Sequence, residues 1–358
     1  MKKITYLSIF TLLVASAILV ISGCTKEGEQ GPAGAAGANG TNGENGINGT
    51  DGTAGCVECH DNDQTVFAMV NQWEHSTHAT GGNYERNGTS CAPCHTSQGF
   101  LETKASGEQV TAEAINNPNP INCYTCHKIH DTYTTTDWDI TYGEPVELWY
   151  GDNAKALYDM GKSNVCANCH QGRIVSPSPV VGSSDMYTVT STRYGMHHGP
   201  VANMFVGAGG YEVGSGYANS LHSTMVEDGC VTCHMATAYG AQAGSHTFSV
   251  GYEYHGAIAV YDAGCVACHT DGVGTIVEET QAETNLLLAD LKQKLMDLNI
   301  LDEDNYVITS SSDPIILTAD QAGAVINYQF VREDRSGGVH NPTYSKKLLE
   351  NTIAALTK

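Results

Sequence analysis

The sequence predicts a mainly helical fold with short β hairpins and long loops. Helices are indicated near the C-terminus, where Leu recurs at positions 287, 288, 291, 295 and 298 with helical spacing. Alternating apolar residues between Thr132 and Tyr150 predict a short hairpin. Long loops are indicated by 39 Gly beside only six Phe and three Trp in 358 residues. A chain with so few large side chains needs a further group to fill its interior.

Residues 1–23 have the form of a lipoprotein signal peptide. Met1-Lys2-Lys3 precedes an apolar run from Ile4 to Ile21, as in secretory signals. The next residues, Ser22-Gly23-Cys24, complete a segment that resembles a bacterial lipobox, in which the Cys becomes the lipidated N-terminus. An uncleaved membrane anchor and an ordinary cleaved signal are the alternatives. We expect export, a lipid on Cys24, and attachment to the cell envelope at the outer membrane, facing the periplasm or the cell surface.

Residues 24–55 are predicted to be the lipidated Cys followed by a collagen-like tether. Gly occupies every third position from Gly28 to Gly55, which is the collagen period. Pro32 is the only proline in this segment, so an isolated triple helix would be weak. We therefore predict a flexible tether that spans roughly 30 Å as a coil. A homo-oligomer built through this segment is the alternative.

Twelve of the 13 Cys form six Cys-x-x-Cys pairs, and a His follows each pair at once. This is the attachment motif of haem c, in which both thiols form thioethers with the porphyrin and the His binds the iron. Zinc sites, redox dithiols and disulfides are the alternatives, and none of them explains a His after every pair. Residues 56–270 are thus predicted to be a hexahaem region, organised around packed haems. The predicted thioether residues are Cys56, Cys59, Cys91, Cys94, Cys123, Cys126, Cys166, Cys169, Cys230, Cys233, Cys265 and Cys268. The predicted proximal iron ligands are His60, His95, His127, His170, His234 and His269.

The chain has 15 His, so nine remain as candidates for the second axial position of each iron. His130 lies three residues after His127, and residues so spaced on one helical face cannot bind the same iron from opposite sides. If His130 is a ligand, it must serve a neighbouring haem, which would bring two porphyrins close together. Met is the rival ligand, but no Met lies in a recognisable ligand motif.

Several short segments resemble those of multihaem cytochromes related to cytochrome c nitrite reductase, hydroxylamine oxidoreductase and octahaem tetrathionate reductase. The resemblance covers roughly residues 56–350. It is carried by Trp73-Glu-His-Ser-Thr-His78, His197-His198-Gly-Pro200, Asn219-Ser-Leu-His222, Ser245-His-Thr-Phe248 and Gly338-Val-His-Asn-Pro342. The resemblance implies that the distal iron ligands are His78, His130, His198, His222, His246 and His340. His197 is indicated nearly as strongly as His198, and His75 and His255 are held in reserve.

Electron transfer is the function that the motifs favour, at the cell envelope and as part of respiratory or extracellular electron transfer. The ammonia-forming nitrite reductases usually carry a Cys-x-x-Cys-Lys haem with an open iron, and this chain has no such motif. We name no catalytic residue. The alternative is a reductase or oxidoreductase of a small nitrogen or sulfur compound, such as nitrite, hydroxylamine or tetrathionate, with one open-coordinate haem.

Residues 271–358 lack Cys and are predicted to be a helical region that packs on the haem region and supplies His340. Helices are expected over Glu278–Leu298 and Thr318–Glu333, and a third is expected to open at Asn341-Pro342. The Leu stripe predicts core packing rather than a dimer seam. The formal net charge of −22 argues against nucleic acid as a partner. Expected partners are redox proteins, either a membrane quinol-oxidising complex or other cytochromes, and the membrane through the lipid.

Overall fold

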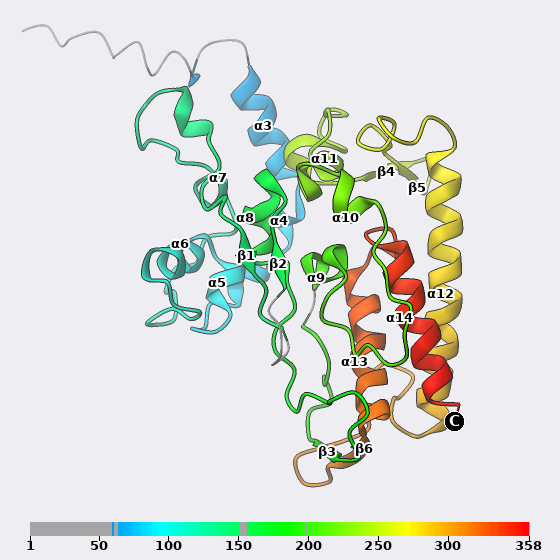
Figure 1. Ribbon diagram of the computed structural model, residues 1–358. Helices are drawn as coiled ribbons and strands as arrows, with labels where there is room; N and C mark the ends of the chain where they lie inside the picture. The colour runs from blue at the N-terminus through cyan, green and yellow to red at the C-terminus, as the bar shows by residue number, and fades with distance from the viewer. Residues whose placement is uncertain (1–58, 61–63, 151–155, 198, 358) are drawn as a thin grey trace, which may run out of the picture. The chain divides into compact units, whose positions relative to one another are not determined.

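The computed structural model describes residues 59–60, 64–150, 156–197 and 199–357 (Figure 1). The chain divides into Met1–Asp51 and Gly52–Lys358, and all described residues belong to the second unit. The expected signal peptide, the tether, Cys24, Cys56 and His198 therefore lie outside the described residues. Within the described ranges, no helix combines the length and the apolar character needed to cross a membrane.

The first part of the described chain consists of short helices, several of which begin at a side-chain cap. Ser76 accepts a hydrogen bond from Ala79 N at the start of one helix, and Thr96 accepts one from Gly99 N at the start of another. Gly99 also lets two helices approach, because a Cβ there would lie 2.4 Å from the carbonyl oxygen of Ala92. The elements are α3 (Thr65–Glu74), α4 (Thr77–Thr80), η1 (Asn83–Glu85), α5 (Ala92–His95), α6 (Ser97–Ser106), α7 (Cys123–Cys126) and η2 (Thr135–Trp138).

The middle part alternates short strands and short helices. The elements are β1 (Val146–Glu147), β2 (Leu157–Tyr158), η3 (Gly161–Ser163), α8 (Asn164–Ala167), β3 (Met186–Val189), α9 (Val201–Val206), α10 (His222–Met225), α11 (Gly229–His234), η4 (Ser245–Thr247), β4 (Gly251–Tyr254) and β5 (Ala257–Val260). All sheets formed by the described residues are antiparallel pairs, namely β1–β2, β3–β6 and β4–β5.

The hairpin predicted within Thr132–Tyr150 is wrong. This segment contains η2 instead, and its only strand, β1, pairs with β2 beyond Tyr150. The cause is a set of local hydrogen bonds to a side chain, which the alternation of apolar residues does not indicate. The carboxylate of Asp137 accepts hydrogen bonds from Thr132 N at 2.8 Å and from Tyr133 N at 3.0 Å, which closes a turn where a strand was expected.

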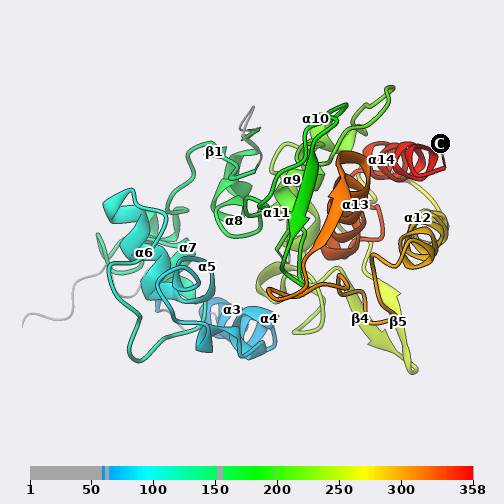
Figure 2. The same ribbon diagram turned by 90° about the horizontal axis from the view of Figure 1, so that it is seen from below.

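The C-terminal part contains the long helices that the sequence predicted. They are α12 (Val273–Asp297), α13 (Ala319–Asp334) and α14 (Pro342–Ala355), which lie side by side in both views (Figures 1 and 2). Strand β6 (Ile315–Thr318) leads into α13 and pairs with β3 (Figure 2). Thr318 and Gln321 form a capping box at the start of α13.

An apolar core lies between these three helices and the β3–β6 pair. It includes Leu291 and Leu295 of the predicted Leu stripe, both fully buried, together with Phe330, Leu317 and Leu348. Leu287 and Leu288 are partly buried against this core, whereas Leu298 is exposed, so all of the stripe but its last residue packs as predicted. Before Val146, by contrast, the described chain buries only three apolar side chains, those of Ala92, Pro93 and Phe100. Side chains alone give that part almost no core.

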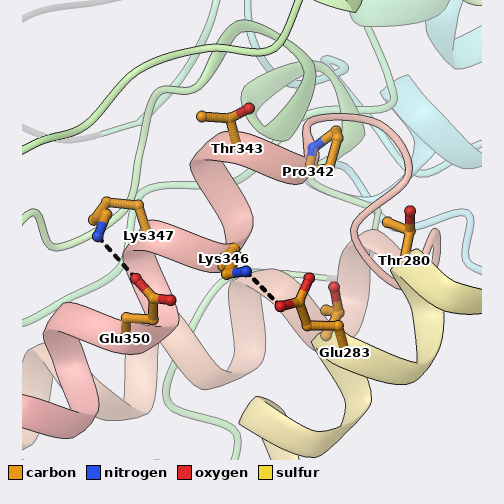
Figure 3. Close-up of a pocket in the computed structure, with 8 residues that line it drawn as sticks. Thr280, Glu283, Pro342, Thr343, Lys346, Lys347 and Glu350 are labelled. Carbon is orange, nitrogen blue, oxygen red and sulfur yellow. Dashed lines mark hydrogen bonds and ion pairs between the residues drawn. The ribbon is translucent and has the colours of Figure 1, made fainter.

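Helices α12 and α14 also meet at a shallow surface pocket of about 450 Å³ (Figure 3). Lys346 of α14 pairs there with Glu283 of α12, and Lys347 pairs with Glu350 at 2.8 Å. These side chains are 35 to 55% exposed, so water screens each pair and it contributes little to stability, at most about 1 kcal/mol. None of the residues that line the pocket belongs to a haem-attachment motif.

Candidate haem-binding sites

The ring of each motif His faces the ring of one His from elsewhere in the chain. We number the sites 1 to 6 in the order of their motifs. The ring centroids are 6.0 to 6.3 Å apart in all six pairs. The pairs are His60–His130, His95–His197, His127–His246, His170–His78, His234–His340 and His269–His222.

These separations fit two imidazoles that bind one iron from opposite sides. A metal-bound imidazole nitrogen lies about 2 Å from the metal, and its ring centroid lies about 1 Å further out, so the two centroids should be about 6 Å apart. The residues present therefore fit a haem with two His ligands at each of the six motifs.

The structure brings five of the six predicted distal residues to a motif His: His78, His130, His222, His246 and His340. At site 2 the facing residue is His197, whereas the sequence favoured its neighbour His198, which lies outside the described residues. The two remaining candidates, His75 and His255, make other contacts. His75 Nδ1 lies 2.7 Å from Asn71 O in its own helix, and the His255 ring lies 4.2 Å from that of Tyr254.

His130 faces the first motif because of an unusual backbone conformation. Its φ of 62° lies in the left-handed region, which residues other than Gly adopt uncommonly. The ring of Tyr133, also at positive φ, stacks on the His130 ring at 5.4 Å and 7°. The turn directs His130 to His60 rather than to His127, three residues earlier. Sites 1 and 3 are thereby neighbours.

The thiols of different motifs also lie together in the interior. Contact between Cys94 and Cys169 joins sites 2 and 4, and it raises the pKa of Cys169 while it lowers the pKa of Cys94. Contact between Cys166 and Cys230 lowers the pKa of Cys230 to about 5 and joins sites 4 and 5.

Sites 5 and 6 are joined in the same way. Contact with Cys233 lowers the pKa of Cys265 to about 7. Site 3 lies near site 4. The charge of Cys126 contributes to raising the pKa of both Cys166 and Cys169. The six motifs therefore form one contiguous group.

Hydrogen bonds hold several rings in the form that binds metal. Backbone carbonyls can only accept, so they fix Nδ1–H as the donor and leave Nε2 free to bind a metal. His127 Nδ1 donates to Trp138 O at 2.8 Å, and His222 Nδ1 donates to Val339 O at 3.1 Å. Burial lowers the pKa of His78 to about 4, with a further contribution from His170. That ring is therefore neutral near pH 7, as an iron ligand must be.

Phe248 lies among three sites, and sequence reasoning gave it no role. Its ring is 4.8 Å from that of His78 at site 4 and 6.1 Å from that of His246 at site 3. Its carbonyl oxygen accepts a hydrogen bond at 2.8 Å from Nδ1 of His234 at site 5. Phe248 has a φ of 56°, so a strained backbone residue holds this junction.

Asn341 links the distal residues of sites 5 and 6. This fully buried residue follows His340 and caps α14. Its Nδ2 donates to Met204 O at 3.1 Å and to Asn219 Oδ1 at 2.9 Å. Its Oδ1 accepts from Ser220 N at 2.9 Å, just before His222. The side-chain amide of Asn341 thus connects the segment that precedes α14 to the segment that precedes α10.

Replacing Asn341 by Ala is expected to lower the free energy of unfolding by about 3 kcal/mol, because several buried polar groups lose their partner. Guanidinium unfolding of the purified protein measures this loss. Asn351→Ala is the matched control, since the Asn351 side chain is only partly buried and its hydrogen bond to Ser215 O is exposed. We expect less than about 1 kcal/mol there. Equal losses in the two variants would contradict the role given to Asn341.

Comparisons with known proteins support the fold. No family model matches the sequence, and no curated protein matches it. The crystal structure of the outer cell wall cytochrome OcwA is similar, with a TM-score of 0.50 and 20% identity. The match covers 80% of this chain and 50% of that chain, so this chain spans about half the length of OcwA. The predicted mainly helical fold with small strand pairs is confirmed, and it resembles the fold of a cytochrome.

Proposed function

We propose that this chain is an electron-transfer cytochrome that covalently binds six haem c groups, each between a motif His and its facing His. The observation that carries the proposal is that all six motif His have such a partner at 6.0 to 6.3 Å. When bound, haem c supplies reversible one-electron chemistry at potentials set by its ligands and surroundings.

The His pairs define what each site does. If each facing pair of His held one iron, no coordination position on that iron would remain for a substrate. Bis-His ligation favours electron transfer over the alternative, a reductase with one open iron. The contiguous motif thiols support a relay, because groups attached to touching thiols are held close together.

The setting of this relay belongs to the same proposal. We place it outside the cytoplasm, anchored through a lipid on Cys24 and held off the outer membrane by the Gly-rich segment from Gly28 to Gly55. The outer cell wall location named for OcwA supports an envelope role. With 39 acidic against 17 basic residues, the chain suits redox partners that present a basic surface.

Exogenous ligands test the proposal against the reductase. Cyanide added to the oxidised protein, and CO added to the reduced protein, are expected to leave the absorption spectrum unchanged, because both axial positions are filled. A spectral change equivalent to one haem at low ligand concentration would favour the reductase.

A further inference from the structure

Asp334 places a buried carboxylate on one of the proposed iron ligands. It is the last residue of α13, and its side chain is 0% exposed. Its Oδ1 lies 2.8 Å from Nδ1 of His340, the distal residue of site 5. Its Oδ2 accepts a hydrogen bond from Ser336 Oγ. Among the ion pairs of the described residues, the one with His340 is the only pair that includes Asp334.

A tight turn creates this contact. Arg335 ends α13 with a φ of 60°, and Gly337 and Gly338 continue the turn with φ of 62° and 92°. A Cβ at Gly338 would lie 2.3 Å from Thr284 Oγ1, so only Gly fits there. The chain therefore reverses within six residues, and the ring of His340 lies against the carboxylate of Asp334.

Three other proposed ligands, at sites 3, 5 and 6, have a backbone carbonyl as the partner of Nδ1. His127 bonds Trp138 O, His222 bonds Val339 O, and His234 bonds Phe248 O. Those acceptors are uncharged carbonyls. Site 5 thus combines one ordinary ligand, His234, with one ligand that donates to a carboxylate.

A carboxylate acceptor changes the electronics of the ligand. It draws the Nδ1 proton toward itself, which makes the opposite nitrogen a stronger electron donor to the metal. The buried negative charge also opposes the addition of an electron nearby, because its field is poorly screened in the interior. Both effects stabilise the oxidised iron.

We propose that Asp334 is a positioning residue that, through His340, holds the reduction potential of site 5 below the value that its two His alone would give. This inference rests on the proposed haem binding. Contacts of Cys230 and Cys233 place site 5 between sites 4 and 6. Asp334 therefore lowers the reduction potential of a haem that lies inside the relay, between its neighbours at sites 4 and 6.

The test is a potentiometric titration of the Asp334→Asn variant, followed by absorption and EPR spectroscopy. Asn keeps the shape and one hydrogen bond but removes the charge. We expect the midpoint potential of one haem to rise while the other five keep their wild-type values and all six remain low spin. Asp334→Glu, which restores the charge, is expected to return that potential toward the wild-type value.

Glu333→Gln is the matched control, since Glu333 is buried beside Asp334 but pairs with Arg332 at 2.7 Å and with Arg335 at 3.9 Å. It is expected to shift the potential of site 5 less than Asp334→Asn does. Unchanged potentials in Asp334→Asn, or equal shifts in the two variants, would overturn the inference.

A readout on the wild-type protein covers the case in which Asp334→Asn does not fold. One low-spin EPR signal should have a narrower spread of g values than the others, as a ligand with anionic character produces. Six signals with the spread of neutral His pairs would refute the inference while leaving the proposed function intact. A protein without covalent haem would refute the proposed function itself.

Discussion

Replacing His197 by Ala is expected to leave six haems attached and to convert one of them from low spin to high spin. His197 faces His95 at 6.3 Å, so its removal opens one axial position without touching the thioether residues of the motif. EPR spectra of the oxidised protein should show one high-spin signal, and the absorption spectrum should now respond to cyanide. The mass of the denatured protein should fall only by the difference between His and Ala.

Two further variants make this result specific. His75→Ala should leave all irons low spin, because the His75 ring bonds its own helix at Asn71 O. His198→Ala should also leave them low spin. High spin in His198→Ala together with low spin in His197→Ala would give the ligand role to His198, the residue preferred from the sequence.

A chain made without haem attachment, in a host that lacks cytochrome c maturation, is expected to lose its structure unevenly. Residues 64–145 bury only Ala92, Pro93 and Phe100 among apolar side chains, which is too little to offset the conformational entropy of ordering this segment. Helices α13 and α14 bury Phe330, Leu348 and many neighbours in their own apolar core. Hydrogen exchange should be nearly complete within seconds over residues 64–145 and should remain slow in α13.

The haem-bearing protein is the control for this experiment, and both parts should be protected in it. Equal protection of residues 64–145 with and without haem would contradict the account, because the side chains alone would then hold that part together. Uniform loss of structure, including α13, would show that the C-terminal core also depends on haem.

The sequence predicted the features that depend on local spacing. The three C-terminal helices are of this kind, because caps, Pro342 and the Leu stripe are read within a few residues. The hairpin at 132–150 was wrong because the carboxylate of Asp137 closes a turn that apolar alternation does not reveal.

Features that depend on tertiary contacts could not be predicted from local spacing in the sequence. His197 and His198 are adjacent, and only the packing decides which ring faces His95. The contact of Asp334 with His340 depends on left-handed residues between them. An acidic residue six positions before a candidate His is a weak signal. Phe248 ends one of the segments that carry the resemblance, but that segment pointed to His246 and not to the Phe248 ring.

The most direct test of the account combines the mass of the denatured protein with a count of its low-spin irons. The account predicts a mass equal to the chain plus six haem c groups, and six low-spin irons without a high-spin one. A mass that matches the bare polypeptide, with or without lipid, would contradict it.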